Sequence, residues 1–225
     1  MNKLNHVAFI MDGNGRWGKK KNKSRNFGHL KGVDTVKAIV KSAFKFKIPI
    51  VTFYVFSTEN WSRPKSEINF LFNLIISYFT KEINEVVNSG IKINILGNVG
   101  PLPINVKKIL KETLKKTSKN KKLLINLAIN YGSKSEIKNA FLNMIRKKIK
   151  FNKKNIKQNL YTKNIPDPDI LIRTGGKKRL SNFMLWQLAY AELYFIDKLW
   201  PDFNETDLKK IIFNYKSVKR NFGGI

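Results

Sequence analysis

Two glycine-containing stretches of the chain carry residue types that bind phosphate. The first is MDGNGRWG, residues 11–18, and the second is RTGGKKRLSN, residues 173–182. Glycine lets consecutive backbone N–H groups turn toward an anion, and the arginine guanidinium adds a fork of permanently charged donors. Each stretch is therefore interpreted as a binding site for a phosphate group.

Asp12 adds a candidate metal ligand to the first stretch. It directly follows the apolar run HVAFIM, which places it at the end of a predicted strand. Mg2+ combines one or two carboxylates with phosphate oxygens of a substrate. A tight turn with an exposed aspartate is the simpler alternative, and it explains the glycines but not the adjacent Arg16 and Trp17. We therefore expect Asp12 to engage Mg2+ beside a bound phosphate.

The first stretch also satisfies G-x-G-x-x-G, the pattern of a dinucleotide-binding turn. Such a turn opens directly into a helix and is followed about 20 residues later by an acidic residue at a strand end. Gly18 is instead followed by KKKNKSRN, which has no apolar periodicity. Asp34 falls inside a predicted helix, and Glu59 comes too late. We therefore reject dinucleotide binding and expect no helix directly after Gly18.

Other signatures of phosphate and acyl chemistry are missing from the sequence. It contains no P-loop lysine motif, no H-E-x-x-H and no G-x-S-x-G. Two phosphate-binding stretches without a P-loop favour two phosphorylated substrates over a kinase or a GTPase.

Apolar and amphipathic segments alternate along the chain and predict the elements that position these stretches. Short apolar strands are expected at His6–Met11, Pro49–Ser57, Ile91–Gly97, Leu123–Asn130, Asp169–Thr174 and Leu193–Ile196. Helices are expected at Gly32–Phe46, Lys65–Asn88, Asn105–Lys116, Lys134–Lys148, Phe183–Glu192 and Thr206–Lys219, and a mobile surface loop at Lys150–Asn164. This order predicts an α/β fold in which residues 1–225 form a single domain around a six-stranded, mostly parallel sheet with helices on both faces.

A third polar stretch, STENWSR at residues 57–63, follows the second predicted strand. Ligands of open α/β sheets bind beyond the carboxyl ends of the strands. We therefore expect residues 57–63 to lie beside the two glycine-containing stretches in one site.

The predicted helix Lys65–Asn88 is apolar over most of its circumference. One stripe contains Ile68, Phe72 and Phe79, and further apolar residues such as Phe70 and Leu74 lie outside it. Such a helix is either deeply buried or lines an apolar cavity. The second alternative would provide a channel for a long hydrophobic ligand.

Composition and charge narrow the class of protein. The 225 residues include no cysteine, which excludes disulfides and cysteine-based metal sites, and no run is long enough to span a membrane. Together these features predict a cytoplasmic protein. The formal net charge of +29 would attract nucleic acid, anionic lipid or phosphorylated small molecules. Most of the excess is lysine scattered on polar segments, so compositional drift on solvated faces is the alternative explanation.

Several blocks together resemble the signature of cis-prenyltransferases. MDGNGRWG, FGHLKG, FSTENWSRP with Glu67, RTGGKKRLSNFMLWQLAYAE and LWPDF occur in the order found in that family. Among its members the chain is most similar to the bacterial undecaprenyl diphosphate synthases. The resemblance extends from His6 to the closing FGG at Phe222–Gly224.

The resemblance implies a prenyltransferase of isoprenoid biosynthesis that condenses isopentenyl diphosphate sequentially onto an allylic primer, typically farnesyl diphosphate, with Mg2+ as cofactor. Each cycle adds a cis double bond and releases pyrophosphate. The implied product is a long polyprenyl diphosphate such as undecaprenyl diphosphate, a lipid carrier in cell-wall (peptidoglycan) biogenesis. The resemblance further implies a homodimer. The apolar product suggests peripheral contact with the inner face of the membrane, and no nucleic-acid partner is expected.

The family's functional residues carry over to matching positions of this chain. Asp12 matches the essential carboxylate that engages Mg2+, Glu192 matches a second metal ligand, and Asn60 matches a proposed proton acceptor. The positions matching substrate-binding residues are Gly13, Asn14, Gly15, Arg16, Trp17, Arg25, His29, Ser57, Thr58, Glu59, Trp61, Arg63, Glu67, Arg173, Arg179, Leu180 and Ser181.

Two positions depart from the family pattern. Family members commonly carry Glu at the position of Lys177, and bacterial members can carry a metal-binding His at that of Lys178. A protonated lysine cannot ligate Mg2+ but can pair with a diphosphate. Two alternatives to an active enzyme stay open at this point. One is a non-catalytic subunit of the same family, and the other is a basic nucleic-acid-binding protein.

Overall fold

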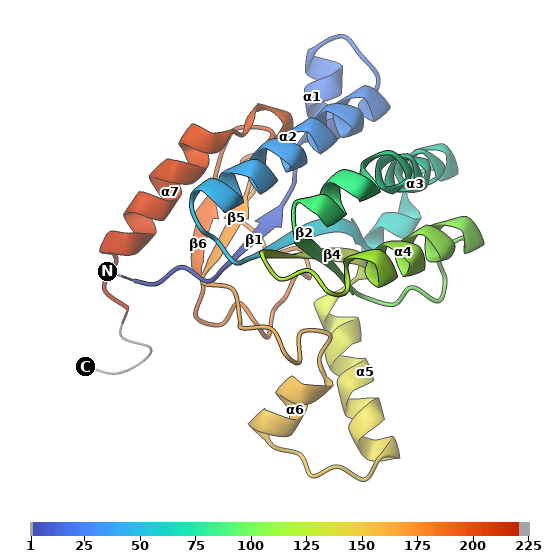
Figure 1. The fold of residues 1–225 in the computed structure, drawn as a ribbon, viewed down its shortest axis with the longest axis vertical. Helices are drawn as coiled ribbons and strands as arrows, with labels where there is room; N and C mark the ends of the chain where they lie inside the picture. The colour runs from blue at the N-terminus through green and yellow to red at the C-terminus, as the bar shows by residue number, and fades with distance from the viewer. Residues whose placement is uncertain (1, 221–225) are drawn as a thin grey trace.

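The computed structural model describes residues 2–220, which are built around one six-stranded sheet (Figure 1). The strand order is β3-β4-β2-β1-β5-β6, and all five pairings are parallel. The prediction of an α/β fold with six strands is confirmed at all six places. The strands are β1 His6–Ile10, β2 Ile50–Ser57, β3 Ile91–Leu96, β4 Leu123–Tyr131, β5 Ile170–Arg173 and β6 Glu192–Phe195.

Side chains alternate between the two faces of the sheet, as the period of a strand requires. In β1, Val7 and Phe9 join the larger core, whereas Ala8 and Ile10 join the smaller one. The larger core packs against four helices, which all cover the same face. These are α2 Arg25–Lys45, α3 Lys65–Asn88, α4 Ile104–Thr117 and α7 Glu205–Ser217.

The opposite face is covered mainly by irregular chain between residues 160 and 191. Ile165, Phe183, Met184 and Leu188 pack there against the smaller core. A helix was expected at Phe183–Glu192, and this prediction is wrong, because that segment consists of successive turns. Three residues at its start, Ser181, Asn182 and Met184, have positive φ, a left-handed conformation that does not propagate a right-handed helix. The layer of helices expected on both faces is thus found mainly on one.

Four shorter helices were not predicted, and the last of them along the chain is η2, Trp200–Asp202. The helix α1, Asn14–Lys20, begins inside MDGNGRWG, so the expectation of no helix at this turn is wrong. The second is η1, Thr58–Ser62. The third is α6, Lys153–Asn159, which lies where a loop was expected, and the side chain of Asn152 caps its first turn. A short polar helix without an apolar stripe carries no periodic signal in the sequence.

The helix α2 also begins seven residues earlier than expected, at Arg25 rather than at Gly32. The hydroxyl of Ser24 accepts a hydrogen bond from Phe27 N at 3.1 Å and caps this end. Since the two predicted site residues Arg25 and His29 lie in these first turns, the cap places them on rigid structure.

The helices α5, Ser133–Arg146, and α6 project away from the sheet as an arm (Figure 1). Three large apolar side chains on this arm, Leu142, Ile145 and Phe151, are exposed. Among residues 2–220 no helix is both long and apolar enough to cross a membrane.

A buried row of polar side chains crosses the sheet on the face of the smaller core. His6 Nε2 accepts from the hydroxyl of Thr52 at 2.6 Å, and Thr52 Oγ1 accepts from Asn126 Nδ2 at 3.0 Å. Asn94 Nδ2 continues the row with a 2.9 Å bond to Asn126 Oδ1. His6 Nδ1 lies 2.7 Å from the carbonyl of Pro166, so that nitrogen carries the proton and the ring is neutral.

Candidate active site

A cavity of 760 Å3 opens at the carboxyl ends of β1, β2 and β5. Because β1 lies between β2 and β5, the three polar stretches meet there as expected. The cavity is lined by fourteen of the predicted site residues: Asp12, Gly13, Asn14, Gly15, Arg16, Arg25, His29, Ser57, Glu59, Asn60, Arg63, Arg173, Arg179 and Ser181.

Asp12 lies between two arginines on the wall of this cavity. Its Oδ2 accepts from Arg173 Nη2 at 2.9 Å, and its Oδ1 accepts from Arg16 Nη2 at 3.1 Å. The backbone carbonyl of Asp12 accepts from Thr174 Oγ1 at 2.8 Å and from Trp200 N at 3.0 Å, which fixes the strand end. The carboxylate therefore lies where anions bound by the two arginines would meet.

Gly175 brings the end of β5 into contact with the first stretch. Its φ is +87°, and a Cβ there would lie 2.5 Å from Arg16 Nη2 and 3.1 Å from Asp12 Cγ. The N–H groups of Gly175 and Gly176 donate to the carbonyls of Lys198 and Ile196. These two N–H groups are therefore engaged within the fold, and Gly175 instead permits the close approach of the two stretches.

Arg173 is buried and holds the turn that follows β5. Its Nη1 donates to Ser181 Oγ at 2.8 Å and to the carbonyl of Arg179. Its Nε has no partner among the described residues. Ser181 has a φ of +50°, so the turn is tightly wound and its hydroxyl points back to the arginine. Arg173 thus connects Asp12 to the second phosphate-binding stretch.

Glu67 gathers three basic side chains from α2 and the start of α3. Its carboxylate accepts from Arg25 Nε at 3.1 Å, from His29 Nε2 at 3.2 Å and from Arg63 Nη1 at 3.0 Å. Burial raises the pKa of Glu67, but hydrogen bonds from Arg25 and His29 and the positive charges of Arg25 and Arg63 outweigh it and lower the pKa to about 2. Burial lowers the pKa of His29, although Glu67 opposes this. Glu67 does not line the cavity, so it holds the cationic wall formed by Arg25, His29 and Arg63 in place from behind.

The end of β2 contributes amide and carboxylate groups. Asn60 Oδ1 accepts from the backbone N–H of Ser57 at 3.1 Å and forms part of a capping box for η1. Glu59 Oε1 accepts from Asn182 Nδ2 at 2.7 Å, which joins this stretch to the turn after β5. Burial raises the pKa of Glu59, but the bond from Asn182 is the strongest of several that lower it on balance.

The donors at this cavity suit a divalent cation only in combination with a bound phosphate. Asp12 and Glu59 are the carboxylates that line it. Within residues 2–220 no group of three or more acidic, His or Cys side chains is arranged to hold a metal ion. Mg2+ commonly takes one or two carboxylates and fills its other positions with phosphate oxygens and water. Asp12 fits such a site when a diphosphate lies beside it.

A smaller, apolar cavity of 140 Å3 lies between α2, α3 and the sheet. It shares wall residues with the larger cavity, so the two adjoin. The shared residues are Met11, Asn14, His29, Val55 and Leu71. Both alternatives for the helix Lys65–Asn88 hold, because Phe72 and Val86 are buried in the core while Leu74 and Tyr78 line an apolar cavity.

Comparison with known proteins identifies the family. A sequence profile described as "Putative undecaprenyl diphosphate synthase" matches residues 10–223. The chain is 46% identical over 227 residues to an isoprenyl transferase of Prochlorococcus marinus subsp. pastoris, covering 98% of this chain and 84% of that protein. It is 43% identical to an isoprenyl transferase of Clostridium perfringens, covering 98% and 90%. The chain belongs to the cis-prenyltransferase family.

Solved structures agree with this family in fold. A crystal structure of lavandulyl diphosphate synthase from Lavandula x intermedia, in complex with dimethylallyl diphosphate, is 33% identical with a TM-score of 0.93, covering 97% of this chain and 98% of that one. A probable undecaprenyl diphosphate synthase from Campylobacter jejuni is 34% identical with a TM-score of 0.85, covering 99% and 100%. The chain is accordingly an isoprenyl transferase with a cis-prenyltransferase fold.

Several predicted site residues of this prenyltransferase lie outside both cavities. Trp17 stacks on Phe27 with ring centroids 5.9 Å apart and donates to Asp202. Trp61 donates to Asn130 Oδ1 at 2.9 Å. Thr58 and Leu180 also lie outside the cavities: the Thr58 hydroxyl donates to Glu59, and Leu180 packs against the smaller core.

Glu192 lies apart from Asp12 within the chain. It is the first residue of β6 and pairs with Ile170 at the amino end of β5, whereas Arg173, the partner of Asp12, is at the carboxyl end. Its Oε1 lies 3.8 Å from Arg220 Nε. One copy of the chain therefore does not bring the two predicted metal ligands together. Lys177 and Lys178, at the positions of departure, are exposed.

The structure adds wall residues of the larger cavity that the sequence interpretation did not assign to the site. Tyr54 stacks on Phe183 with centroids 4.3 Å apart, and its hydroxyl lies 3.3 Å from the carbonyl of Ser181. Asn182 completes the wall through Glu59. The period of β2 could have identified Tyr54, because it places this residue on the opposite face from the apolar Phe53.

Proposed function

We propose that this chain catalyses the sequential cis-condensation of isopentenyl diphosphate onto an allylic diphosphate, with farnesyl diphosphate as the primer and Mg2+ as the cofactor. The product is a long-chain polyprenyl diphosphate such as undecaprenyl diphosphate, the lipid carrier for cell-wall glycans. The observation that carries the proposal is the position of Asp12 between Arg16 and Arg173, at the junction of two cationic walls and beside an apolar cavity.

Each of the two diphosphates is assigned to one group of basic side chains in the larger cavity. The allylic diphosphate is proposed to bind at the turn of residues 13–16 with Arg25 and His29, because the apolar cavity begins at His29 and can receive its hydrocarbon tail. Isopentenyl diphosphate is proposed to bind at Arg173, Arg179 and Ser181. This arrangement places the two reacting carbons between the walls and beside Asp12.

The reaction forms a bond between C4 of isopentenyl diphosphate and C1 of the allylic substrate. The allylic C1–O bond breaks and pyrophosphate leaves, while a proton is lost from C2 of the isopentenyl unit. When bound, Mg2+ supplies positive charge that stabilises the departing pyrophosphate. The guanidinium groups of Arg16 and Arg25 stabilise the same charge, and holding both substrates in line supplies much of the remaining rate advantage.

Asn60 matches the family's proposed proton acceptor, and the departing pyrophosphate or water is the alternative. Asn60 lines the larger cavity, but its side-chain carbonyl already accepts from Ser57 N. An amide is a poor base, so Asn60 suits the orientation of a substrate or water better than the removal of a proton on its own.

We propose that residues 1–225 act as one cis-prenyltransferase domain and that two copies form a homodimer in the cytoplasm, at the inner face of the membrane to which the product belongs. The exposed apolar residues of the arm support a partner surface. Glu192 lies apart from Asp12 within one copy. It could therefore contact a cation bound beside Asp12 only if that Asp12 belongs to such a partner. Sedimentation analysis of Ile145→Asp against the unchanged chain tests this, with a monomer expected for the variant.

The proposed function is tested by incubating the chain with farnesyl diphosphate, labelled isopentenyl diphosphate and Mg2+, and by sizing the extracted lipid. We expect a ladder of polyprenyl products that disappears when EDTA removes the cation and returns when Mg2+ is added in excess. A chain that binds both diphosphates but yields no extractable lipid would contradict the proposal and support a non-catalytic subunit.

A further inference from the structure

The apolar cavity is enclosed by two helices that are joined by polar contacts only near its two ends. Near the active site, Glu67 of α3 pairs with Arg25 and His29 of α2. Farther along both helices, Lys37 Nζ of α2 lies 2.6 Å from Glu82 Oε1 of α3. The side chains between these contacts are apolar and line the cavity: Val33 and Val36 from α2, and Leu71, Leu74, Ile75, Tyr78 and Phe79 from α3.

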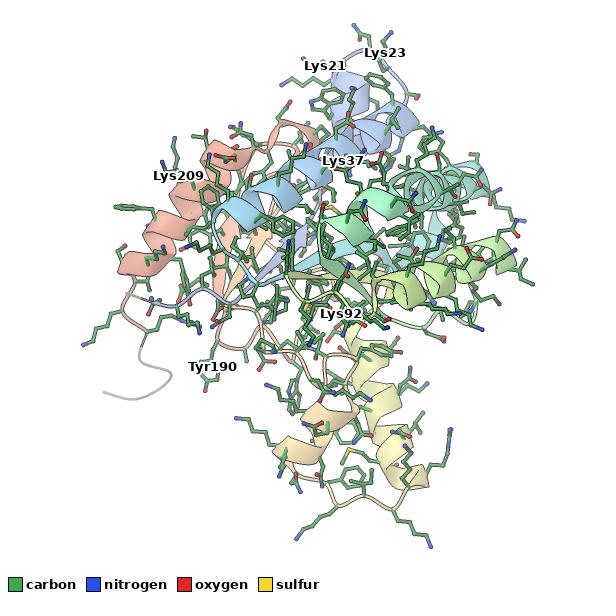
Figure 2. All side chains as sticks on the ribbon, in the orientation of Figure 1. Lys21, Lys23, Lys37, Lys92, Tyr190 and Lys209 are labelled. Carbon is green, nitrogen blue, oxygen red and sulfur yellow. The ribbon has the colours of Figure 1, made fainter. Side chains whose placement is uncertain are left out.

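Tyr78 lies at the end of the cavity that is remote from Asp12. The wall residues shared with the larger cavity include His29 and Leu71, whereas Tyr78 follows Leu71 by about two helical turns. Lys37 Nζ lies 5.4 Å from the centroid of the Tyr78 ring, and the same ammonium pairs with Glu82. Figure 2 shows Lys37 on α2 on the side that faces α3. The aromatic ring is therefore fixed from outside the cavity by an ion pair.

The apolar cavity is too small for a growing chain. Its volume is 140 Å3, whereas pockets that enclose a drug-sized ligand measure roughly 300–1,000 Å3. Each condensation adds another five-carbon unit in the same place, so the chain must displace part of the wall. Burial raises the pKa of Tyr78 to about 12, and Glu82 adds to this, so the ring stays neutral and presents an apolar face to the cavity.

We propose that Tyr78 is the barrier that determines product length, and that the pair Lys37–Glu82 holds this barrier closed. The inference rests on the proposed function, since it requires that a prenyl chain enters the apolar cavity. Lys37 and Glu82 are partly exposed, and an ion pair of that kind is weak. A chain of growing length can therefore open the contact. Elongation stops at the length at which this contact opens more slowly than the product is released.

The first test removes the barrier and sizes the products. Tyr78→Ala is expected to shift the distribution to longer chains, because it removes the aromatic ring from the remote end of the apolar cavity. Phe70→Ala is the matched control, a partly buried aromatic residue of the same helix that lines neither cavity. Tyr78→Leu, with less loss of volume, keeps the test valid if the alanine variant does not fold.

The second test changes the ion pair alone. Lys37→Met keeps the apolar stem and removes the charge, so we expect longer products, and Lys31→Met is the control because Lys31 pairs with Asp34 on the surface of the same helix. Since the natural chain has no cysteine, Cys at positions 37 and 82 can be joined by a short bis-maleimide. The joined protein is expected to accumulate shorter products.

The outcomes separate the two proposals. If the unchanged chain incorporates no isopentenyl diphosphate, the proposed function fails. If it does elongate, and the Tyr78 and Lys37 variants and the cross-linked protein all give the distribution of the unchanged chain, the barrier is disproved and the function stands.

Discussion

Arg173 Nη2 lies 2.9 Å from Asp12 Oδ2, and this contact joins side chains at the carboxyl ends of β5 and β1. The two residues are 161 positions apart in the sequence. The same arginine donates to Ser181 through its other terminal nitrogen, so one buried guanidinium orients both the carboxylate and the second phosphate-binding stretch.

Replacing Arg173 by Lys tests how much the planar guanidinium group contributes to the reaction. Lysine keeps the charge but cannot donate to Asp12 and Ser181 at once in the same geometry. The loss of one or two charge-assisted bonds, each about 1.5–3 kcal/mol, predicts a fall in kcat/KM for isopentenyl diphosphate of roughly 10- to 100-fold or more. Steady-state kinetics measure it. Arg146→Lys, at an exposed position on α5, is the control and should leave the kinetics unchanged.

Glu67→Gln tests whether the basic side chains of the larger cavity depend on the Glu67 carboxylate for their positions. The amide keeps the shape but loses the charge that draws Arg25, His29 and Arg63 together. We expect the KM for the allylic diphosphate to rise while kcat for bound substrate changes less. An unchanged KM, in protein that is shown to be folded, would mean that the three basic residues hold their places without Glu67.

The pKa of Glu67 adds a pH dependence with a defined sign. Because its folded-state pKa is about 2 and lies below the ordinary value of 4.5, the stabilisation is present above pH 4.5 and is lost as the pH falls toward 2. Acid unfolding followed by circular dichroism is expected to occur at a higher pH midpoint in Glu67→Ala than in Glu67→Asp.

His6 predicts a second, milder acid effect. Burial lowers its pKa from 6.5 to about 4, and the nearby Asp167 and Asp169 oppose this only in part. The folded protein therefore binds fewer protons than the unfolded chain in this window, and stability falls as the pH falls from about 6.5 to about 4. The full loss is about 3 kcal/mol. Urea unfolding of His6→Asn should show a smaller decline between pH 7 and pH 5, and equal slopes would contradict the assignment.

The sheet and the long helix α3 could be predicted because each has a strong local signal. The strands are short apolar runs that end in polar stretches, and the predicted bounds of α3 coincide with the observed Lys65–Asn88. The convergence of residues 11–18, 57–63 and 173–182 was predicted because each stretch follows the carboxyl end of a strand, and it is observed because β1 lies between β2 and β5. Tertiary contacts decide what the sequence could not show. The helix expected at 183–192 is replaced by left-handed turns that pack on the smaller core.

The candidate site, like the fold, could be predicted from the sequence only in part. Most of the residues that line the larger cavity were predicted from their types and from the family resemblance, but their partners were not. That Glu67 also pairs with Arg25 and His29 depends on how α2 packs beside α3, which no spacing in the sequence encodes, whereas its pair with Arg63 is local. The separation of Glu192 from Asp12 depends likewise on the register of β6 against β5.

The rate of the first condensation in Asp12→Asn tests the central assignment most directly. The amide preserves size and the contact with Arg173 but removes the charge that would engage Mg2+ and adjoin the departing pyrophosphate. A single-turnover measurement with farnesyl diphosphate, isopentenyl diphosphate and Mg2+ should show a loss of about 100-fold or more, while Asp34→Asn, an exposed carboxylate of α2, keeps the unchanged rate. A rate for Asp12→Asn within a factor of about two of the unchanged chain, equivalent to less than 1 kcal/mol, would contradict the role of Asp12 and with it the account of the site.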